Sequence, residues 1–185
     1  MGEASETLFM NVVLIGYRCA GKTVVGKRLG ERLQRRFVDT DDLLEGRLGI
    51  PISDIVKSYG WGHFRAMEKQ IVEEISNQDH LVIAPGGGAV LQAENVTALR
   101  KNGLIIWLKA HGEAIRKRME QDTRNFVRRP TLTGKGALEE LEEVMAYRES
   151  FYERAAEVEL NTSNLDVEAV MEAVLLIFRE GIRRA

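Results

Sequence analysis

The sequence predicts an α/β protein in which five parallel strands form one sheet, covered by helices on both faces. Three observations support this class. Short apolar runs recur along the chain, the segments between them carry apolar residues at helical spacing, and a glycine-rich turn directly follows the first run. No internal repeat or linker divides the 185 residues. We therefore expect one domain over residues 10–185, preceded by a flexible N-terminal tail over residues 1–9.

The expected strands are short, buried runs rich in β-branched residues. They cover residues 12–15, 37–38, 81–84, 104–108 and 158–160, of which the last is the weakest. Apolar residues at helical spacing predict helices over residues 22–34, around 64–75, after the fourth strand through Ile115 and Met119, and over 166–179. The polar segment 122–136 is basic and glycine-bearing, which favours a mobile lid. An ordinary solvated loop is the alternative.

Composition narrows the classes of partner. The formal net charge is −2 at neutral pH, whereas a general nucleic-acid or membrane-surface binder is expected to be basic. No apolar run approaches the roughly 18 residues of a membrane span. The single cysteine, Cys19, excludes an intramolecular disulfide framework. These features predict a cytoplasmic protein with neither a nucleic-acid nor a membrane partner.

The glycine-rich turn matches the phosphate-binding pattern G-x-x-x-x-G-K-[ST]. It consists of Gly16, Tyr17, Arg18, Cys19, Ala20, Gly21, Lys22 and Thr23. The turn follows a strand and opens a helix, so backbone N–H groups and the helix dipole can face a phosphate. Lys22 can reach the β- and γ-phosphates, and the Thr23 hydroxyl can ligate Mg²⁺. A nucleoside triphosphate site is predicted. Cys19 is interpreted as a small loop residue, because no histidine forms a local motif with it.

Two carboxylates follow the second strand. Asp39 and Asp41 are two residues apart, and alternate residues of a strand point the same way. We expect both at the ligand-binding edge of the sheet, one supporting Mg²⁺ through water and the other orienting an attacking hydroxyl. An acidic cap on the following helix is the alternative.

Three further features indicate the acceptor. Arg65 lies in an otherwise core-facing helical pattern, as does Arg148, and residues 86–88 are a Gly-Gly-Gly run directly after the third strand. Glycine lets backbone approach a bound ring closely. Each arginine alone is typical of a surface ion pair. Together with the paired acids, they predict a small hydroxylated substrate that carries an anionic group.

With these motifs in order, the sequence resembles the shikimate kinases from about Asn11 to the final helix. The motifs that carry the resemblance are residues 16–23, Asp39-Thr40-Asp41, residues 49–55, Phe64-Arg65, residues 86–90 and Arg129-Pro130. The resemblance implies a P-loop NTPase fold of the nucleoside-monophosphate-kinase type, and transfer of the ATP γ-phosphate to the 3-hydroxyl of shikimate. It also favours a monomer.

The resemblance implies a role for each matching position. Lys22, Asp41 and Arg129 are the expected catalytic residues, with Arg129 as the lid arginine. ATP is expected to contact Gly16, Tyr17, Arg18, Cys19, Ala20, Gly21, Lys22, Thr23, Val24, Arg118 and Arg129. Shikimate is expected to contact Asp41, Arg65, Gly86, Gly87, Gly88 and Arg148. Mg²⁺ is expected at Thr23 and, through water, at Asp39. Arg116 competes with Arg118 for the place beside adenine.

One departure from the family pattern keeps the acceptor open. The family usually has a glutamate after the glycine that precedes Phe-Arg, where this chain has Trp61. A kinase of the same fold acting on another small hydroxy acid therefore stays an alternative. A non-catalytic nucleotide-binding regulatory module is a second one. It would need lost catalytic residues, yet Lys22, Asp39, Asp41 and Arg129 are all present.

Overall fold

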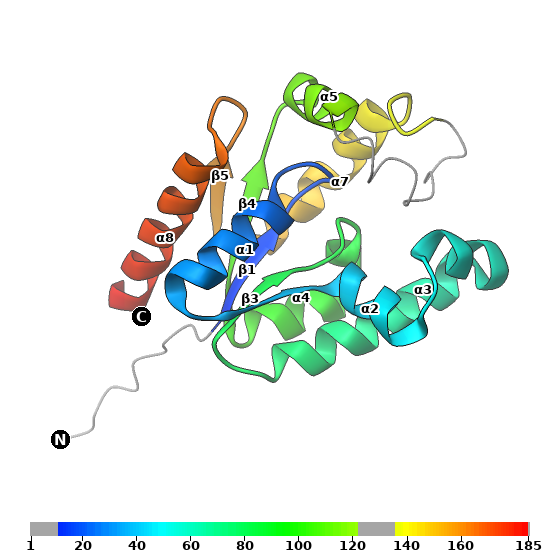
Figure 1. The fold of residues 1–185 in the computed structure, drawn as a ribbon, viewed down its shortest axis with the longest axis horizontal. Helices are drawn as coiled ribbons and strands as arrows, with labels where there is room; N and C mark the ends of the chain where they lie inside the picture. Colours follow the sequence, from blue (N-terminus) through cyan, green and yellow to red (C-terminus); the bar gives the residue numbers. More distant parts are fainter. Residues whose placement is uncertain (1–10, 122–135, 185) are drawn as a thin grey trace.

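The computed structural model describes residues 11–121 and 136–184, in which all strands belong to one parallel sheet. The order across this five-stranded sheet is β2-β3-β1-β4-β5. The strands are β1 (Asn11–Ile15), β2 (Arg36–Asp39), β3 (Leu81–Ala84), β4 (Gly103–Lys109) and β5 (Val158–Asn161). The predicted fold class is confirmed (Figure 1).

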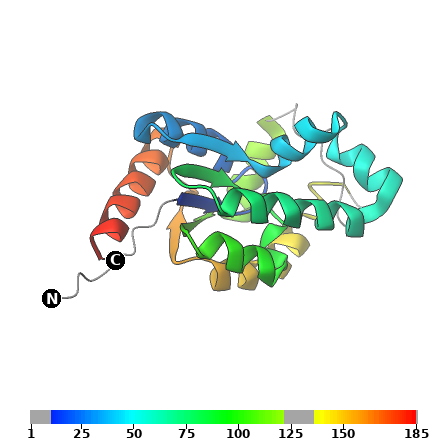
Figure 2. The same ribbon diagram turned by 90° about the horizontal axis from the view of Figure 1, so that it is seen from below.

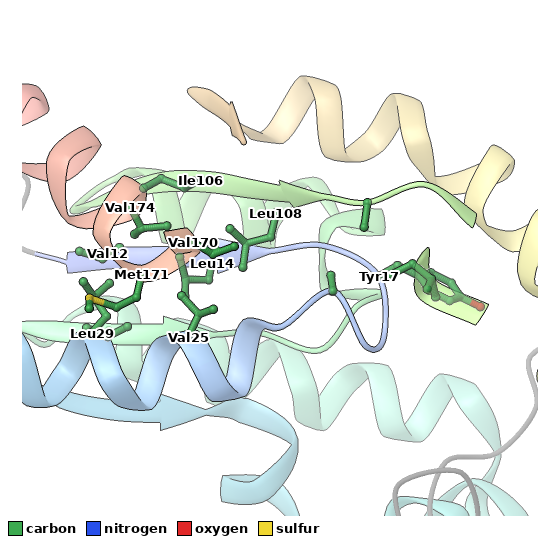
Figure 3. Packing of buried hydrophobic residues seen from close by; sticks show 14 of the residues in the cluster. Val12, Leu14, Tyr17, Val25, Leu29, Ile106, Leu108, Val170, Met171 and Val174 are labelled. Atoms are coloured by element: carbon green, nitrogen blue, oxygen red, sulfur yellow. The ribbon is translucent and has the colours of Figure 1, made fainter. Parts of the chain in front are cut away.

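Helices cover both faces of the sheet (Figures 1 and 2). They are α1 (Lys22–Leu33), α2 (Thr40–Leu48), α3 (Ile52–Ser76), η1 (Ala89–Leu91), α4 (Ala93–Arg100), α5 (Gly112–Gln121), α7 (Leu141–Ala155) and α8 (Val167–Arg184). The side chains of β1 alternate between two cores. Val12 and Leu14 pack in one core with residues of α1 and α8 (Figure 3). Val13 and Ile15 pack in the other with residues of α2, α3 and α4.

α1 lies unusually close to the edge strand β2. A Cβ atom at Gly26 would sit 2.7 Å from Cδ2 of Phe37, and one at Gly30 would sit 2.8 Å from the carbonyl oxygen of Arg35. Only hydrogen fits at these two positions, so the two glycines allow the helix to pack flush against the strand. This packing holds the start of α1 beside the end of β2.

The segment α3 is helical over more of the chain than the sequence predicted. Helical structure begins at Ile52, well before the expected start near Phe64, and is broken at Gly60 (φ 79°, ψ 167°). Apolar residues Ile52 and Ile55 are both buried. Their helical turn was missed because the apolar spacing restarts at the break.

Two expectations fall outside the described residues. These are the N-terminal tail and, apart from Gly136, the lid over residues 122–136. Within the described residues, no helix combines the length and apolar character that a membrane crossing needs.

Candidate active site

The phosphate-binding loop joins β1 to α1 through several left-handed backbone conformations. Gly16 has φ 145°, Cys19 has φ 58° and Gly21 has φ 103°. A Cβ atom at Gly16 would lie 2.6 Å from the carbonyl oxygen of Leu108. Sterics and backbone angles therefore both require glycine at this position. The loop ends at the N-terminus of α1, where unpaired N–H groups and the helix dipole favour a phosphate.

A cavity of about 630 Å³ lies in front of this loop. From the loop and α1 it is lined by Arg18, Cys19, Ala20, Gly21, Lys22, Thr23, Val24, Val25 and Lys27. Its far side is formed by Arg118, Met119, Thr162, Leu165, Asp166, Val167 and Val170. This size suits a nucleotide. We call it the donor cavity.

Arg118 and its competitor Arg116 point to different places. The Arg118 guanidinium donates a 2.6 Å hydrogen bond to the carbonyl oxygen of Thr162, on the wall of the donor cavity. Arg116 lies 3.7 Å from Glu142 and does not line the cavity. The geometry therefore favours Arg118 as the neighbour of a bound base.

Not every residue of the predicted ATP set lines this cavity. Gly16 and Tyr17 are absent from its lining, and Tyr17 is instead a buried member of the apolar cluster drawn in Figure 3. Burial raises the pKa of the Tyr17 hydroxyl. Arg129 lies outside the described residues, so its role stays a prediction.

Lys22 is buried within its own loop. Its ammonium donates to the carbonyl oxygens of Gly16 at 2.8 Å and Tyr17 at 3.1 Å. Lys22 also lines the donor cavity, so its charge is available to a phosphate bound there. This is the location that a phosphate-binding lysine requires.

Asp39 and Asp41 do not share a strand face, and that expectation is wrong. Asp39 is the last residue of β2 and caps α2, accepting hydrogen bonds from the backbone N–H groups of Asp41 at 3.1 Å and Asp42 at 3.4 Å. Asp41 lies in the first turn of α2. The helix begins at the residue after the strand ends, so the Asp39 carboxylate meets the Thr23 hydroxyl while Asp41 lines a different part of the site. The capping alternative is correct for Asp39.

Thr23 and Asp39 form a pair of oxygen donors at the mouth of the loop. The Thr23 hydroxyl donates to the Asp39 carboxylate at 2.8 Å. Hydroxyl, carboxylate, phosphate and water oxygens are the ligands that Mg²⁺ takes in nucleotide sites. The described residues contain no group of three or more acidic, histidine or cysteine side chains able to hold a metal without a nucleotide. The hydroxyl and carboxylate of Thr23 and Asp39 are oxygens of the kind that Mg²⁺ takes.

A second cavity, of about 60 Å³, adjoins the loop on its other side. It is lined by Arg18, Asp41, Ile52, Trp61, Phe64, Arg65, Glu68, Gly86, Gly87, Gly88 and Arg148. These residues come from the loop, α2, α3, the turn after β3 and α7. We call it the acceptor cavity. The structure thus brings together all six residues predicted to bind the acceptor.

The three glycines after β3 form one wall of the acceptor cavity. A Cβ atom at Gly86 would lie 2.6 Å from an Asp41 carboxylate oxygen, and one at Gly88 would lie 2.8 Å from Cζ of Arg65. Larger residues would fill the space between these charged groups. The turn is held by a 2.6 Å hydrogen bond that the Tyr152 hydroxyl donates to the carbonyl oxygen of Gly87.

The acceptor cavity concentrates buried charge. Arg65 and Glu68 form a 2.6 Å ion pair on α3, and the Glu68 side chain is only 2% exposed. Burial raises the pKa of Glu68 to about 7, although the Arg65 guanidinium opposes the shift, and the nearby Asp41 carboxylate adds to it. Arg148 is buried on α7, and its Nε atom has no hydrogen-bond partner among the described residues. The buried Arg148 guanidinium and the half-buried Arg65 guanidinium therefore face a cavity that can receive an anion.

Trp61 is part of this site. The Arg65 guanidinium lies 5.5 Å from the centre of the Trp61 ring, which packs edge-on against Phe64. Where the family usually has a carboxylate, this chain thus has an aromatic face that supports the arginine by a cation–π contact.

Sequence reasoning assigned no role to Glu68 or Tyr152. Glu68 lies one helical turn after Phe64 and precedes the buried residues Ile71 and Val72, so it is an acid on a core-facing stripe. That position was a usable signal. Nothing in the sequence around Tyr152 indicates its bond to Gly87, because 65 residues separate them.

Comparisons with known proteins agree with this geometry. The family model described as shikimate kinase matches residues 18–178. A shikimate kinase of Symbiobacterium thermophilum is 41% identical over 166 residues, which are 90% of this chain and 94% of that protein. Shikimate kinase 2 of Photorhabdus laumondii subsp. laumondii is 39% identical over 175 residues, covering 94% and 99% of the two chains.

Solved structures show the same likeness. A shikimate kinase from Acinetobacter baumannii, solved in complex with shikimate, superposes with a TM-score of 0.85. It is 28% identical, and the match covers 93% of this chain and 94% of the other. The similarity extends over nearly the whole length of each chain, including the elements that form both cavities.

Proposed function

The chain belongs to the shikimate kinase family, and we propose that its two cavities bind ATP and shikimate for transfer of the γ-phosphate to the 3-hydroxyl group. The products are shikimate 3-phosphate and ADP, in the pathway of aromatic amino acid biosynthesis. One observation carries the acceptor assignment. Arg65, Arg148 and Asp41 line a single small cavity beside the phosphate-binding loop. The Acinetobacter baumannii relative, solved with shikimate, supports this assignment.

On the donor side, the loop from Gly16 to Thr23, together with Val24, surrounds the phosphates of ATP. Lys22 supplies a positive charge to the β- and γ-phosphates. Thr23 would hold Mg²⁺, and Asp39 would support the ion through water. When bound, Mg²⁺ neutralises charge that develops on the phosphate oxygens. Arg118 lies beside adenine, and Arg129 acts on the transferring phosphate.

On the acceptor side, Arg65 and Arg148 bind the shikimate carboxylate by charge-assisted hydrogen bonds. The backbone at Gly86, Gly87 and Gly88 lies against the ring. These contacts place the 3-hydroxyl beside Asp41, and this positioning of the reacting groups supplies most of the catalysis.

Transfer itself exchanges one bond for another. The 3-hydroxyl oxygen forms a bond to the γ-phosphorus, while the bond from that phosphorus to the β,γ-bridging oxygen breaks and leaves ADP. The hydroxyl proton passes to the Asp41 carboxylate and then to solvent.

One observation favours an acceptor other than shikimate. Trp61 replaces the family's usual glutamate and lines the acceptor cavity. An altered wall can change which small hydroxy acid fits best, so a same-fold kinase for another such acid is the alternative.

An assay of ADP production decides between these acceptors. The chain is incubated with ATP and Mg²⁺ and with shikimate, quinate or gluconate in turn, and a reaction without acceptor gives the background. We expect shikimate to give the highest kcat/KM. A higher value with quinate or gluconate would overturn the assignment, and ADP release equal to background with every acid would indicate a non-catalytic module.

We also propose a monomeric enzyme in the cytoplasm. Support comes from the single cysteine, which suits a reducing compartment, and from the mildly acidic net charge. Two substrates of small size are the expected partners, and each has its own cavity within one chain.

A further inference from the structure

Arg18 belongs to both cavities. It is the third residue of the phosphate-binding loop, and it lines the donor cavity and the acceptor cavity alike. Among the described residues, no other side chain lines both. On the acceptor side, Gly87 approaches the same loop closely, since a Cβ atom there would lie 3.3 Å from the carbonyl oxygen of Gly16. Arg18 thus stands on the route between the bound donor and the bound acceptor.

The Arg18 side chain is held in place by a buried acid. Its Nη2 atom lies 2.9 Å from Oε1 of Glu140, and the Glu140 side chain is fully buried while that of Arg18 is 12% exposed. Glu140 directly precedes α7 and accepts a backbone hydrogen bond from Val144 at 2.9 Å. The backbone of Glu140 is therefore fixed at the helix end, next to which its carboxylate meets Arg18. A guanidinium has five N–H donors, so this contact leaves others to face a ligand.

The other two arginines that line the acceptor cavity already face other anionic groups. Arg65 is paired with Glu68, and Arg148 is the other cation that faces the substrate carboxylate. A phosphoryl group entering this cavity adds further negative charge beside Asp41. Of the cations that line the acceptor cavity, Arg18 alone also lines the donor cavity.

We infer that Arg18 contacts the phosphoryl group during transfer and remains bonded to it in shikimate 3-phosphate, while Glu140 positions the guanidinium. This inference rests on the proposed function. It makes Arg18 a catalytic residue through its side chain, beyond its place in the loop. Preorganised donors aimed at developing charge are a major source of catalysis in phosphoryl transfer.

The test compares wild type with Arg18→Met and Arg18→Lys. We expect Arg18→Met to lower kcat by roughly 10- to 100-fold, the value of one hydrogen bond to a charged group. Affinity for shikimate 3-phosphate, measured by calorimetry, should fall by a similar factor, whereas affinity for shikimate should change by less than about twofold. Arg18→Lys keeps the charge without the planar fork, so it should lie between the two.

Two further variants separate a catalytic role from a structural one. Glu140→Gln removes the charge that positions Arg18, so kcat and product affinity should fall together by roughly 3- to 10-fold. Arg28→Met is the matched control, because its 2.8 Å pair with Glu168 is exposed and lines neither cavity. It should leave both quantities unchanged.

Specific outcomes overturn the inference. Unchanged kcat in Arg18→Met would do so, as would equal losses of affinity for shikimate and for its 3-phosphate in a folded protein. If Arg18→Met does not fold, Arg18→Gln answers the same question, and a glutamine variant with wild-type product affinity removes Arg18 from the phosphoryl site. Wild type is assayed first with shikimate. Failure there contradicts the proposed function, whereas failure confined to the Arg18 variants contradicts this inference only.

Discussion

The donor and acceptor cavities lie on two sides of one loop and are built in opposite ways. The donor cavity is about ten times larger, and nine of its lining residues fall between positions 18 and 27. The acceptor cavity is small, and its charged residues come from positions as far apart as Arg18 and Arg148. The first uses local backbone geometry to bind phosphates. The second depends on buried charges that only the complete fold brings together.

This difference indicates which features of the protein determine the specificity for each substrate. Backbone N–H groups at a helix N-terminus bind any polyphosphate, so the donor cavity tolerates change in most of its side chains. A buried guanidinium without its anion is costly, so the acceptor cavity is sensitive to every charge in it. Losses in the two cavities should therefore separate cleanly in kinetic measurements.

The largest effect should come from Asp41→Asn. Asparagine keeps the shape of aspartate but cannot take the hydroxyl proton, so kcat should fall by about 10²–10⁴-fold. ATP affinity should stay near the wild-type value, because Asp41 lines only the acceptor cavity. Steady-state kinetics and nucleotide titration measure the two quantities. Near-normal turnover would remove Asp41 from its assigned role.

Next come the two arginines that face the acceptor. Arg65→Ala and Arg148→Ala should each raise the KM for shikimate by roughly 10- to 150-fold and leave the KM for ATP nearly unchanged. Lysine at either position should restore part of the loss. If both grip one carboxylate, the double variant should lose less than the product of the single losses.

Arg118→Ala is the reciprocal control for this pair. It lines the donor cavity only, so it should raise the KM for ATP and not that for shikimate. A folded Arg148→Ala protein that loses both affinities equally would show that the cavities are not independent.

The smallest effect concerns Glu68 and the pH dependence of stability. Burial raises the pKa of this carboxyl to about 7 in the folded protein. The folded state therefore holds the proton more tightly than the unfolded chain does. The resulting stabilisation is complete below the ordinary pKa of 4.5 and is lost as the pH rises through about 7.

Glu68→Gln imitates the protonated group at every pH. From pH 5 to pH 8, the Tm of wild type should fall by about 5–10 °C relative to this variant. Glu74→Gln is the control, because the hydrogen bond from Arg47 lowers the pKa of that exposed acid. This variant keeps Glu68, so its Tm should fall with pH in parallel with that of wild type. Parallel curves of Tm against pH for Glu68→Gln and wild type would contradict the cause assigned here.

Sequence patterns predicted the strands and the phosphate-binding loop, because each of these patterns lies within a short stretch of the chain. The third strand was predicted with the bounds that the structure has, Leu81–Ala84, and the loop was recognised from eight adjacent residues. The strand-face argument for Asp39 and Asp41 was wrong, since a helix cap overrides strand alternation at that junction. At such a junction a single residue decides between continuing the strand and capping the helix, and hydrophobic periodicity does not resolve a choice at one residue.

The acceptor cavity was predicted as a set of residues but not as a charge network. Arg65 and Arg148 were found because a cation in an apolar pattern is unusual. Glu68 was not assigned, although it lies three residues after Arg65 on the same helix, which was a usable signal. Glu140 was not assigned because its role depends on the distance between elements: it meets Arg18 across 122 residues. Residues that pair across such a separation have no characteristic spacing in a single sequence, so only the fold reveals them.

The close packing of α1 on β2 also constrains how this chain can change over evolutionary time. Gly26 has no room for a Cβ atom because the ring of Phe37 occupies the space. A larger residue at 26 is accepted only in a background where residue 37 has already become smaller. The two positions are thus mutationally contingent on each other, and the order in which substitutions arise decides which of them a lineage can keep.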